Sequence, residues 1–132
     1  MDFGFKPGMN FEAELVVGEE HVTRHLGEDL PLFATPYMIN WMELSCVDFM
    51  RRSLPEGFDS VGAGIAVTHG AATPLGMKVK LKAEITDVNG AIVDFKLEAW
   101  DEECKISEGT HKRAVIEFEK FRKKVLKKAG QL

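Results

Sequence analysis

The chain has 132 residues, of which 45% are hydrophobic and 29% are charged, and its formal net charge is −4. This length allows one compact domain with a core, so we expect a single domain over residues 1–132 that ends in a basic tail at 121–132. The acidic balance argues against a body built mainly to hold nucleic acid.

The cysteines and the chain ends indicate the cellular compartment. Cys46 lies in an apolar helical run and Cys104 lies beside a turn, so no disulfide framework is suggested. The first eight residues contain no continuous apolar stretch, and no run approaches the roughly 20 apolar residues that a membrane span requires. We therefore expect a soluble protein in a reducing, cytoplasmic compartment, without a membrane or nucleic-acid partner.

The first elements are predicted to be short strands. Residues 12–17 read as a strand, and Val22 to Leu26 continue it after a turn at Gly18. A polar loop bounded by Gly27 and Pro31 follows.

A long helix is predicted over Pro36 to Ser53. Apolar residues recur at helical spacing over a wide surface, at Met38, Met42, Cys46 and Phe49, with Ile39, Val47 and Met50 alongside. Thr35 followed by Pro36 is a start signal, because threonine accepts free backbone N–H groups as a cap and proline suits the first helical position. Pro55 and Gly57 end the helix.

The rest of the chain is predicted to be extended, over residues 60–73, 77–88, 91–100 and 105–118. Apolar and charged residues alternate in the second and third of these runs. Asn89-Gly90 suits a tight type I′ hairpin, and Asp101 begins a second turn. These patterns predict an α+β fold in which a meander of four long strands forms a curved antiparallel sheet wrapped around the central helix.

Two residues of this arrangement need an explanation. Glu43 lies within the buried helix, where an ionised carboxylate is costly unless it is compensated. His69 shares a strand face with Val61, Ile65 and Val67, so it points toward the helix if they do. A salt bridge for Glu43 and a structural role for His69 are the plain alternatives, but a histidine that meets Glu43 there is suited to general acid or base catalysis.

Thr35 joins these two residues as a candidate. By itself it reads as a helix cap, but an acyl-transfer site needs a carboxylate, an imidazole and donors for an oxyanion, and a helix N-terminus offers such donors. Eight helical residues rise roughly 12 Å, so Thr35 and Glu43 do not touch directly if both are helical.

Several motifs resemble the hotdog-fold thioesterases of the fluoroacetyl-CoA thioesterase type. The similarity extends from about residue 22 to 121, and its motifs are spread over the helix and two strands. They are Phe33-Ala34-Thr35, Trp41-Met42-Glu43, Val67-Thr68-His69-Gly70-Ala71-Ala72-Thr73-Pro74 and Gly109-Thr110-His111-Lys112-Arg113-Ala114-Val115-Ile116.

The resemblance implies a hotdog fold and hydrolysis of a small acyl-CoA thioester to the free acid and CoA. The catalytic threonine, glutamate and histidine of the family fall on Thr35, Glu43 and His69, and Gly62 and Arg113 are implied to line the acyl pocket. A homodimer or a dimer of dimers is implied, and open sheet edges favour the same assembly. We expect the active site at the subunit boundary and no cofactor, with coenzyme A forming part of the substrate.

The chain departs from the fluoroacetyl-specific pattern before the helix. Only Gly27 to Leu32 separate Leu26 from Phe33, and this short lid contains no aromatic residue. We therefore expect a more general small acyl-CoA substrate, with Glu43 acting either as the nucleophile or as the base for a water.

Two other functions remain open. One is a hotdog hydratase or dehydratase acting on an acyl thioester, and the other is a non-catalytic acyl-CoA binding module. No residues have metal-ligand spacing, and neither a phosphate loop nor a nucleophile elbow is present. The basic run Arg122 to Lys128 reads as a solvated face of a terminal helix, and its lysines are also candidates for contacting the CoA phosphates.

Overall fold

The computed structural model describes residues 2–132. The elements in chain order are β1 (Asn10–Val16), the 3-10 turn η1 (Glu19–His21), β2 (Val22–Thr23), β3 (Leu32–Phe33), α1 (Thr35–Arg51), β4 (Phe58–Val67), β5 (Lys78–Asn89), β6 (Ile92–Trp100), β7 (Lys105–Glu117) and α2 (Phe118–Lys128). The expected long helix and the four long strands are therefore confirmed, but the strand expected over 60–73 ends at Val67, before His69.

The main sheet has five antiparallel strands in the order β1-β5-β6-β7-β4, and β2 pairs with β3 in a separate ribbon. Strands β5, β6 and β7 form the expected meander. The prediction of a four-stranded meander was wrong, because β4 pairs with β7 and the chain then crosses to β5. Strand β4 consequently forms one edge of the sheet.

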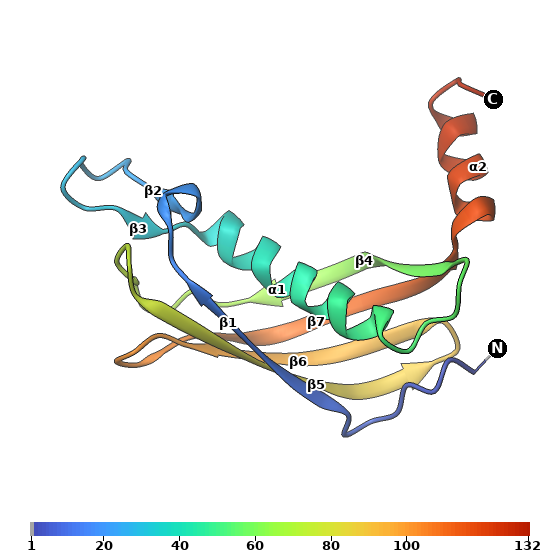
Figure 1. Cartoon of the computed structure of the whole chain (residues 1–132), viewed down its shortest axis with the longest axis horizontal. Coiled ribbons are helices and arrows are strands. Elements are labelled where there is room, and N and C mark those ends of the chain that lie inside the picture. The colour runs from blue at the N-terminus through green and yellow to red at the C-terminus, as the bar shows by residue number, and fades with distance from the viewer. Residues whose placement is uncertain (1) are drawn as a thin grey trace.

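Helix α1 lies along the concave face of the curved sheet (Figure 1). Four residues at spacings of four, Met38, Met42, Cys46 and Met50, are completely buried against it. They pack in one core cluster with Leu81, Ile85, Phe95 and Leu97. Burying a side chain of this size is worth about 1.5–3 kcal/mol, so this stripe holds the helix in the sheet.

Three local predictions need correction. The strand expected over 22–26 ends at Thr23, where the two-residue ribbon ends. The hairpin after β5 uses Gly90 and Ala91, because Asn89 pairs with Ile92. Among residues 2–132 only glycines have positive φ, and Gly90 has φ of 61°, so the turn has the type II′ sign pattern instead of type I′.

A β-bulge divides β4. The pairing with β7 shifts between Gly62 and Gly64, so Ala63 is an extra residue and the alternation of faces changes there. Ile65 and Val67 pack against the core, as expected, but Val61 does not. Grouping Val61 on the same face as His69 was therefore wrong, because the prediction assumed an unbroken strand.

Helix α2 projects from the end of β7, away from the sheet (Figure 1). It contains no buried residue, and Phe118 and Val125 are about half exposed. The basic tail is therefore a free-standing amphipathic helix within one chain. Within residues 2–132, none of the helices combines the length and the apolar character that crossing a membrane would require.

Candidate active site

Thr35 occupies the first turn of α1. The segment before it is pinned by backbone hydrogen bonds from Phe33 to the Thr73 carbonyl (2.8 Å) and from Ala34 to the His21 carbonyl (2.9 Å). Ala34 is the N-cap residue, and no side chain caps this end of the helix. The prediction that Thr35 caps α1 was therefore wrong, and its hydroxyl is free for another partner.

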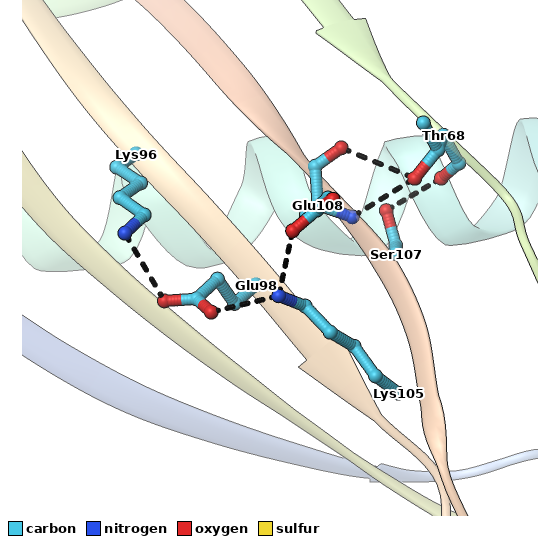
Figure 2. Close-up of polar contacts among 6 residues, drawn as sticks. All are labelled: Thr68, Lys96, Glu98, Lys105, Ser107 and Glu108. Atoms are coloured by element: carbon cyan, nitrogen blue, oxygen red, sulfur yellow. Dashed lines mark hydrogen bonds and ion pairs between the residues drawn. The ribbon is translucent and has the colours of Figure 1, made fainter.

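His69 lies just beyond β4 and is held from both sides. The N–H groups of Thr68 and Gly70 donate to the carbonyls of Glu108 (2.9 Å) and Ile106 (2.8 Å) on β7. The Ser107 hydroxyl also donates to the Thr68 carbonyl (2.7 Å). Figure 2 shows this contact beside those of Glu108. These bonds extend the β4–β7 pairing past the end of β4 and fix the position of the His69 backbone.

The side chain of Thr68 adds to this anchor. Its hydroxyl donates to the Glu108 carbonyl (3.3 Å) and accepts from the Glu108 N–H (3.2 Å). Lys105 bridges the carboxylates of Glu98 and Glu108 at the same end of the sheet (Figure 2).

Gly109 permits the close approach of the two strands beside this anchor. A Cβ atom at this position would overlap the carbonyl oxygen of Ala66 and lie 2.7 Å from Cα of Val67. Only glycine therefore fits opposite Val67, two residues before His69.

The Thr35 hydroxyl lies 2.7 Å from Nδ1 of His69. Burial lowers the pKa of His69, so the imidazole is neutral at neutral pH. Its other ring nitrogen, Nε2, is buried and has no hydrogen-bond partner among residues 2–132. Because an unpaired buried polar group costs about 1–3 kcal/mol, Nε2 is the atom of this pair that is available to a bound molecule.

The Thr35–His69 pair borders a small hollow. Its volume is about 190 Å³, and it is lined in part by His25, Phe33 and Ala72. The ring of Phe33 meets the His69 ring edge to face, with centroids 6.4 Å apart. The hollow therefore combines apolar lining with the polar groups of His25 and of the Thr35–His69 pair.

Glu43 lies two turns further along α1, beside Gly62 of β4. Its side chain is 37% exposed, so the carboxylate is only partly buried although the helix itself is packed against the sheet. A Cβ atom on Gly62 would come within 2.8 Å of Oε2 of Glu43. The missing side chain at Gly62 thus makes room for the carboxylate at the edge of the sheet.

Arg113 faces Glu43 from β7 and is only 3% exposed. Its Nη1 lies 3.6 Å from Oε2 of Glu43, its Nε donates to the Ser60 hydroxyl (3.0 Å) and its Nη2 donates to the Ser60 carbonyl (3.1 Å). Arg113 is therefore a buried, oriented cation rather than a surface strand arginine.

Two further side chains belong to this group and were not among the predicted site residues. Ser60 holds Arg113, and His111 lies 3.1 Å from Nη1 of Arg113 through its Nε2 atom. The strand pattern contains a signal for His111, because residues 111 and 113 point to the same face of β7. No pattern indicated Ser60, because the bulge changes which residues of β4 face inward.

Cys46 also lies in the electrostatic environment of Glu43 and Arg113. Burial raises the pKa of its thiol to about 12, with a smaller contribution from Glu43 and an opposing one from Arg113. The thiol therefore stays protonated and is a poor nucleophile. Within residues 2–132, no three His, Cys, Asp or Glu side chains form a group suited to a metal ion.

The candidate residues thus form two separate groups within one chain. Thr35 pairs with His69 at the start of α1, and Glu43 lies with Gly62 and Arg113 further along. Among residues 2–132, no hydrogen bond or ion pair joins Glu43 to His69, so the two side chains do not meet within one chain. Thr35 and Glu43 are eight positions apart on α1, a rise of roughly 12 Å, so they do not touch directly.

The fold and these motifs correspond to known proteins. The family model described as fluoroacetyl-CoA-specific thioesterase matches residues 17–119. The fluoroacetyl-CoA thioesterase of Streptantibioticus cattleyicolor is 39% identical over 135 residues, which cover 97% of this chain and 97% of that protein.

Solved structures agree with this assignment. A structure of the fluoroacetyl-CoA thioesterase superposes with a TM-score of 0.87 at 39% identity, covering 95% of this chain and 98% of that one. A hot-dog-like protein from Thermanaerovibrio acidaminovorans has the same fold, with a TM-score of 0.87 at 24% identity and 97% of both chains covered. The helix wrapped by an antiparallel sheet is therefore a hotdog fold, and the chain belongs to the fluoroacetyl-CoA-specific thioesterase family.

Proposed function

We propose that this protein hydrolyses a small acyl-CoA thioester to the free acid and CoA, with Thr35, Glu43 and His69 as its catalytic residues. Membership of a thioesterase family supports the reaction class. The observation that carries the site assignment is the 2.7 Å contact between Thr35 and His69, which leaves the buried Nε2 of His69 unpartnered beside a hollow.

The proposed reaction forms a bond between an oxygen nucleophile and the thioester carbonyl carbon and then breaks the carbon–sulfur bond. Glu43 either attacks that carbon to give an anhydride, which water opens, or takes a proton from the attacking water. In the water route, the imidazole of His69 passes to the CoA thiolate the proton that Glu43 has taken from the water. In the anhydride route, it passes on the proton that is released when water opens the anhydride. Thr35 orients His69, and Arg113 and the backbone around Gly62 border the acyl group.

We further propose that the working unit is a homodimer. The edge strand β4 has residues 62–64 exposed, and its pairing in the chain is with β7. An unpaired strand edge favours pairing with a second chain. Antiparallel pairing of two β4 strands about a two-fold axis between Gly62 and His69 places these positions opposite one another, and strands in a sheet are about 4.8 Å apart.

This pairing supplies what one chain lacks. Glu43 lies beside Gly62 on one subunit, so the two-fold axis brings it toward the Thr35–His69 pair of the other. The catalytic set is then assembled from two chains at the subunit boundary. A dimer of dimers is compatible with the same edge pairing.

The substrate is proposed to be broader than fluoroacetyl-CoA. The lid from Gly27 to Leu32 carries no aromatic side chain, and Leu30 within it and Leu26 before it are 47% and 63% exposed. A short lid of this kind offers no aromatic ring that would select one acyl group. The free thiols of Cys46 and Cys104 agree with a cytoplasmic location.

The test is release of free CoA thiol from a panel of short acyl-CoA thioesters. Wild-type protein should release thiol, and Glu43→Gln and His69→Ala should each reduce kcat by at least about 10²-fold. Treatment with a chelator should leave the rate unchanged, since no cofactor is proposed. Near wild-type turnover by both variants on every substrate would overturn the assignment, and binding or hydration without thiol release would favour the two alternatives.

Mixed dimers test the shared site. If Glu43 and His69 of one site come from different chains, mixing the Glu43→Gln and His69→Ala proteins restores one intact site in each mixed dimer. About a quarter of the wild-type activity should then return, because half of the dimers are mixed and half of their sites are intact. If subunit exchange is confirmed and the mixture recovers no activity, both residues of a site come from the same chain.

A further inference from the structure

His111 lies on β7 two residues before Arg113, and both side chains enter the space between the sheet and α1. It is only 2% exposed, and its ring stacks on Phe95 with centroids 6.4 Å apart. A buried histidine is usually accounted for by packing alone. Both polar atoms of this ring, however, have specific partners in the candidate site.

The partners determine the protonation of the ring. Nδ1 lies 2.8 Å from the carbonyl oxygen of Gly64, which only accepts, so Nδ1 carries a hydrogen. Nε2 lies 3.1 Å from Nη1 of Arg113, which only donates, so Nε2 carries none. His111 is therefore a neutral imidazole in a single tautomer.

The charged surroundings of His111 are the guanidinium of Arg113, on its own strand, and the carboxylate of Glu43, on α1. Burial is the main cause that lowers the pKa of His111, and Arg113 lowers it further, whereas the Gly64 carbonyl and Glu43 oppose the shift. The neutral form that the two hydrogen bonds require is thus the stable one at neutral pH.

The contact with Gly64 lies at the bulge of β4. There the ladder between β4 and β7 is out of register, so strand pairing alone does not hold the extra residue. His111 supplies a side-chain donor at this point. It thereby fixes the backbone next to Gly62, whose missing side chain leaves room for Glu43.

The contact with Arg113 completes the orientation of the guanidinium. Ser60 accepts from Nε and Nη2, and His111 accepts from Nη1, the nitrogen that also faces Glu43 at 3.6 Å. Without the acceptor on His111, the guanidinium keeps only the partners on Ser60 and gains freedom to rotate toward Glu43.

We propose that His111 is a positioning residue for the thioesterase site, whose neutral imidazole holds the Arg113 guanidinium and the Gly62–Gly64 bulge in place around Glu43. This inference rests on the proposed function, because Glu43 and Arg113 act on a substrate only there. His111 acts in this proposal through Arg113 and the bulge, which are its hydrogen-bond partners.

Two substitutions separate the two contacts. The amide oxygen of His111→Gln reaches the position of Nε2 and accepts from Arg113, whereas the amide nitrogen of His111→Asn replaces Nδ1 as the donor to Gly64. The Asn variant should lose roughly 10- to 10²-fold in kcat with little change in KM, and the Gln variant should recover most of kcat. Lys112→Gln is the matched control. It removes the charge of the neighbouring, outward-facing side chain and should retain wild-type kcat.

Thermal unfolding of each variant separates positioning from stability. Wild-type kcat in both the Asn and the Gln variant, or losses that follow only their melting temperatures, would overturn the proposal.

The wild-type protein provides a test that is independent of turnover. Nitrogen-15 NMR of His111 should show a protonated Nδ1 and an unprotonated Nε2 at neutral pH, and the Arg113 side-chain N–H signals should broaden in the Asn variant. A protonated Nε2 would contradict the proposal whether or not the protein hydrolyses thioesters. Absence of thiol release together with the expected tautomer would instead contradict the proposed function and leave the contact established.

Discussion

The Thr35 hydroxyl and Nδ1 of His69 lie 2.7 Å apart, although the two residues are 34 positions apart in the chain. Thr35 stands at the start of α1, and His69 follows the edge strand β4. The threonine hydroxyl therefore contacts His69 and does not cap the helix. Nε2 of His69 is left without a hydrogen-bond partner among residues 2–132.

Substitution of Thr35 tests that relationship. Thr35→Val removes the hydroxyl at nearly constant volume and should reduce kcat by roughly 10- to 10²-fold, while Thr35→Ser should keep most of the activity. The unfolding free energy should fall by about 1 kcal/mol in Thr35→Val, because the hydrogen bond to His69 is lost, and should change little in Thr35→Ser. Steady-state kinetics and urea denaturation measure the two effects, and a fully active Thr35→Val variant would contradict a role in orienting His69.

Gly62→Ala should disturb the carboxylate of Glu43. The new methyl group would lie 2.8 Å from Oε2, so the side chain must move from its place beside Arg113. We expect kcat to fall by about tenfold or more, because a displacement of about 1 Å at a reacting group is costly.

Gly64→Ala is the matched control for that change. An added Cβ atom at Gly64 has no heavy atom within 4 Å in the chain, yet the residue lies on the same strand. If Gly62→Ala and Gly64→Ala lose the same activity at the same oligomeric state, the contact with Glu43 does not cause the loss in Gly62→Ala.

The buried histidines make stability depend on pH. Burial lowers the pKa of both His69 and His111 below the ordinary value of 6.5, so the unfolded chain binds more protons in the window below that value. The unfolding free energy should therefore fall as pH decreases from about 6.5 toward the native pKa values, and these two groups should contribute no slope well above it.

Urea midpoints across this pH window measure the slope. His111→Gln removes one of the two groups and should give a shallower decrease than the wild type. A stability that rises on acidification through the same window, or an unchanged slope in the variant, would contradict the assignment.

Helix α2 provides a test of CoA binding. Lys123, Lys124, Lys127 and Lys128 are exposed on a helix that stands away from the sheet, as Figure 1 shows. If they attract the phosphates of CoA, replacing all four with glutamine should raise KM by a few-fold at low salt, with kcat retained, and added salt should reduce the difference.

Lys82→Gln with Lys96→Gln removes exposed lysines from β5 and β6 and serves as the control. An unchanged KM in the α2 variant would exclude a role of these lysines in substrate binding.

Much of the architecture can be predicted from local patterns of apolar and polar residues in the sequence. The four-residue spacing of Met38, Met42, Cys46 and Met50 predicted α1, and the two-residue alternation through residues 77–100 predicted β5 and β6. These patterns are reliable because each element must bury one continuous stripe or face. The same patterns failed where one residue breaks the period, as at the bulge near Ala63, and where a turn shifts by one residue, as at Gly90.

The residues themselves determined the long buried helix, the antiparallel strands and the family motifs around Thr35, Glu43, His69 and Arg113. Only the tertiary structure decided that β4 pairs with β7, that Thr35 meets His69, and that His111 and Ser60 surround Arg113. The physical reason is that sequence periodicity is a local property, whereas these contacts join residues far apart in the chain. Periodicity reports which face of an element is buried, whereas contacts between elements depend on the crossover and the bulge, which no local pattern specifies.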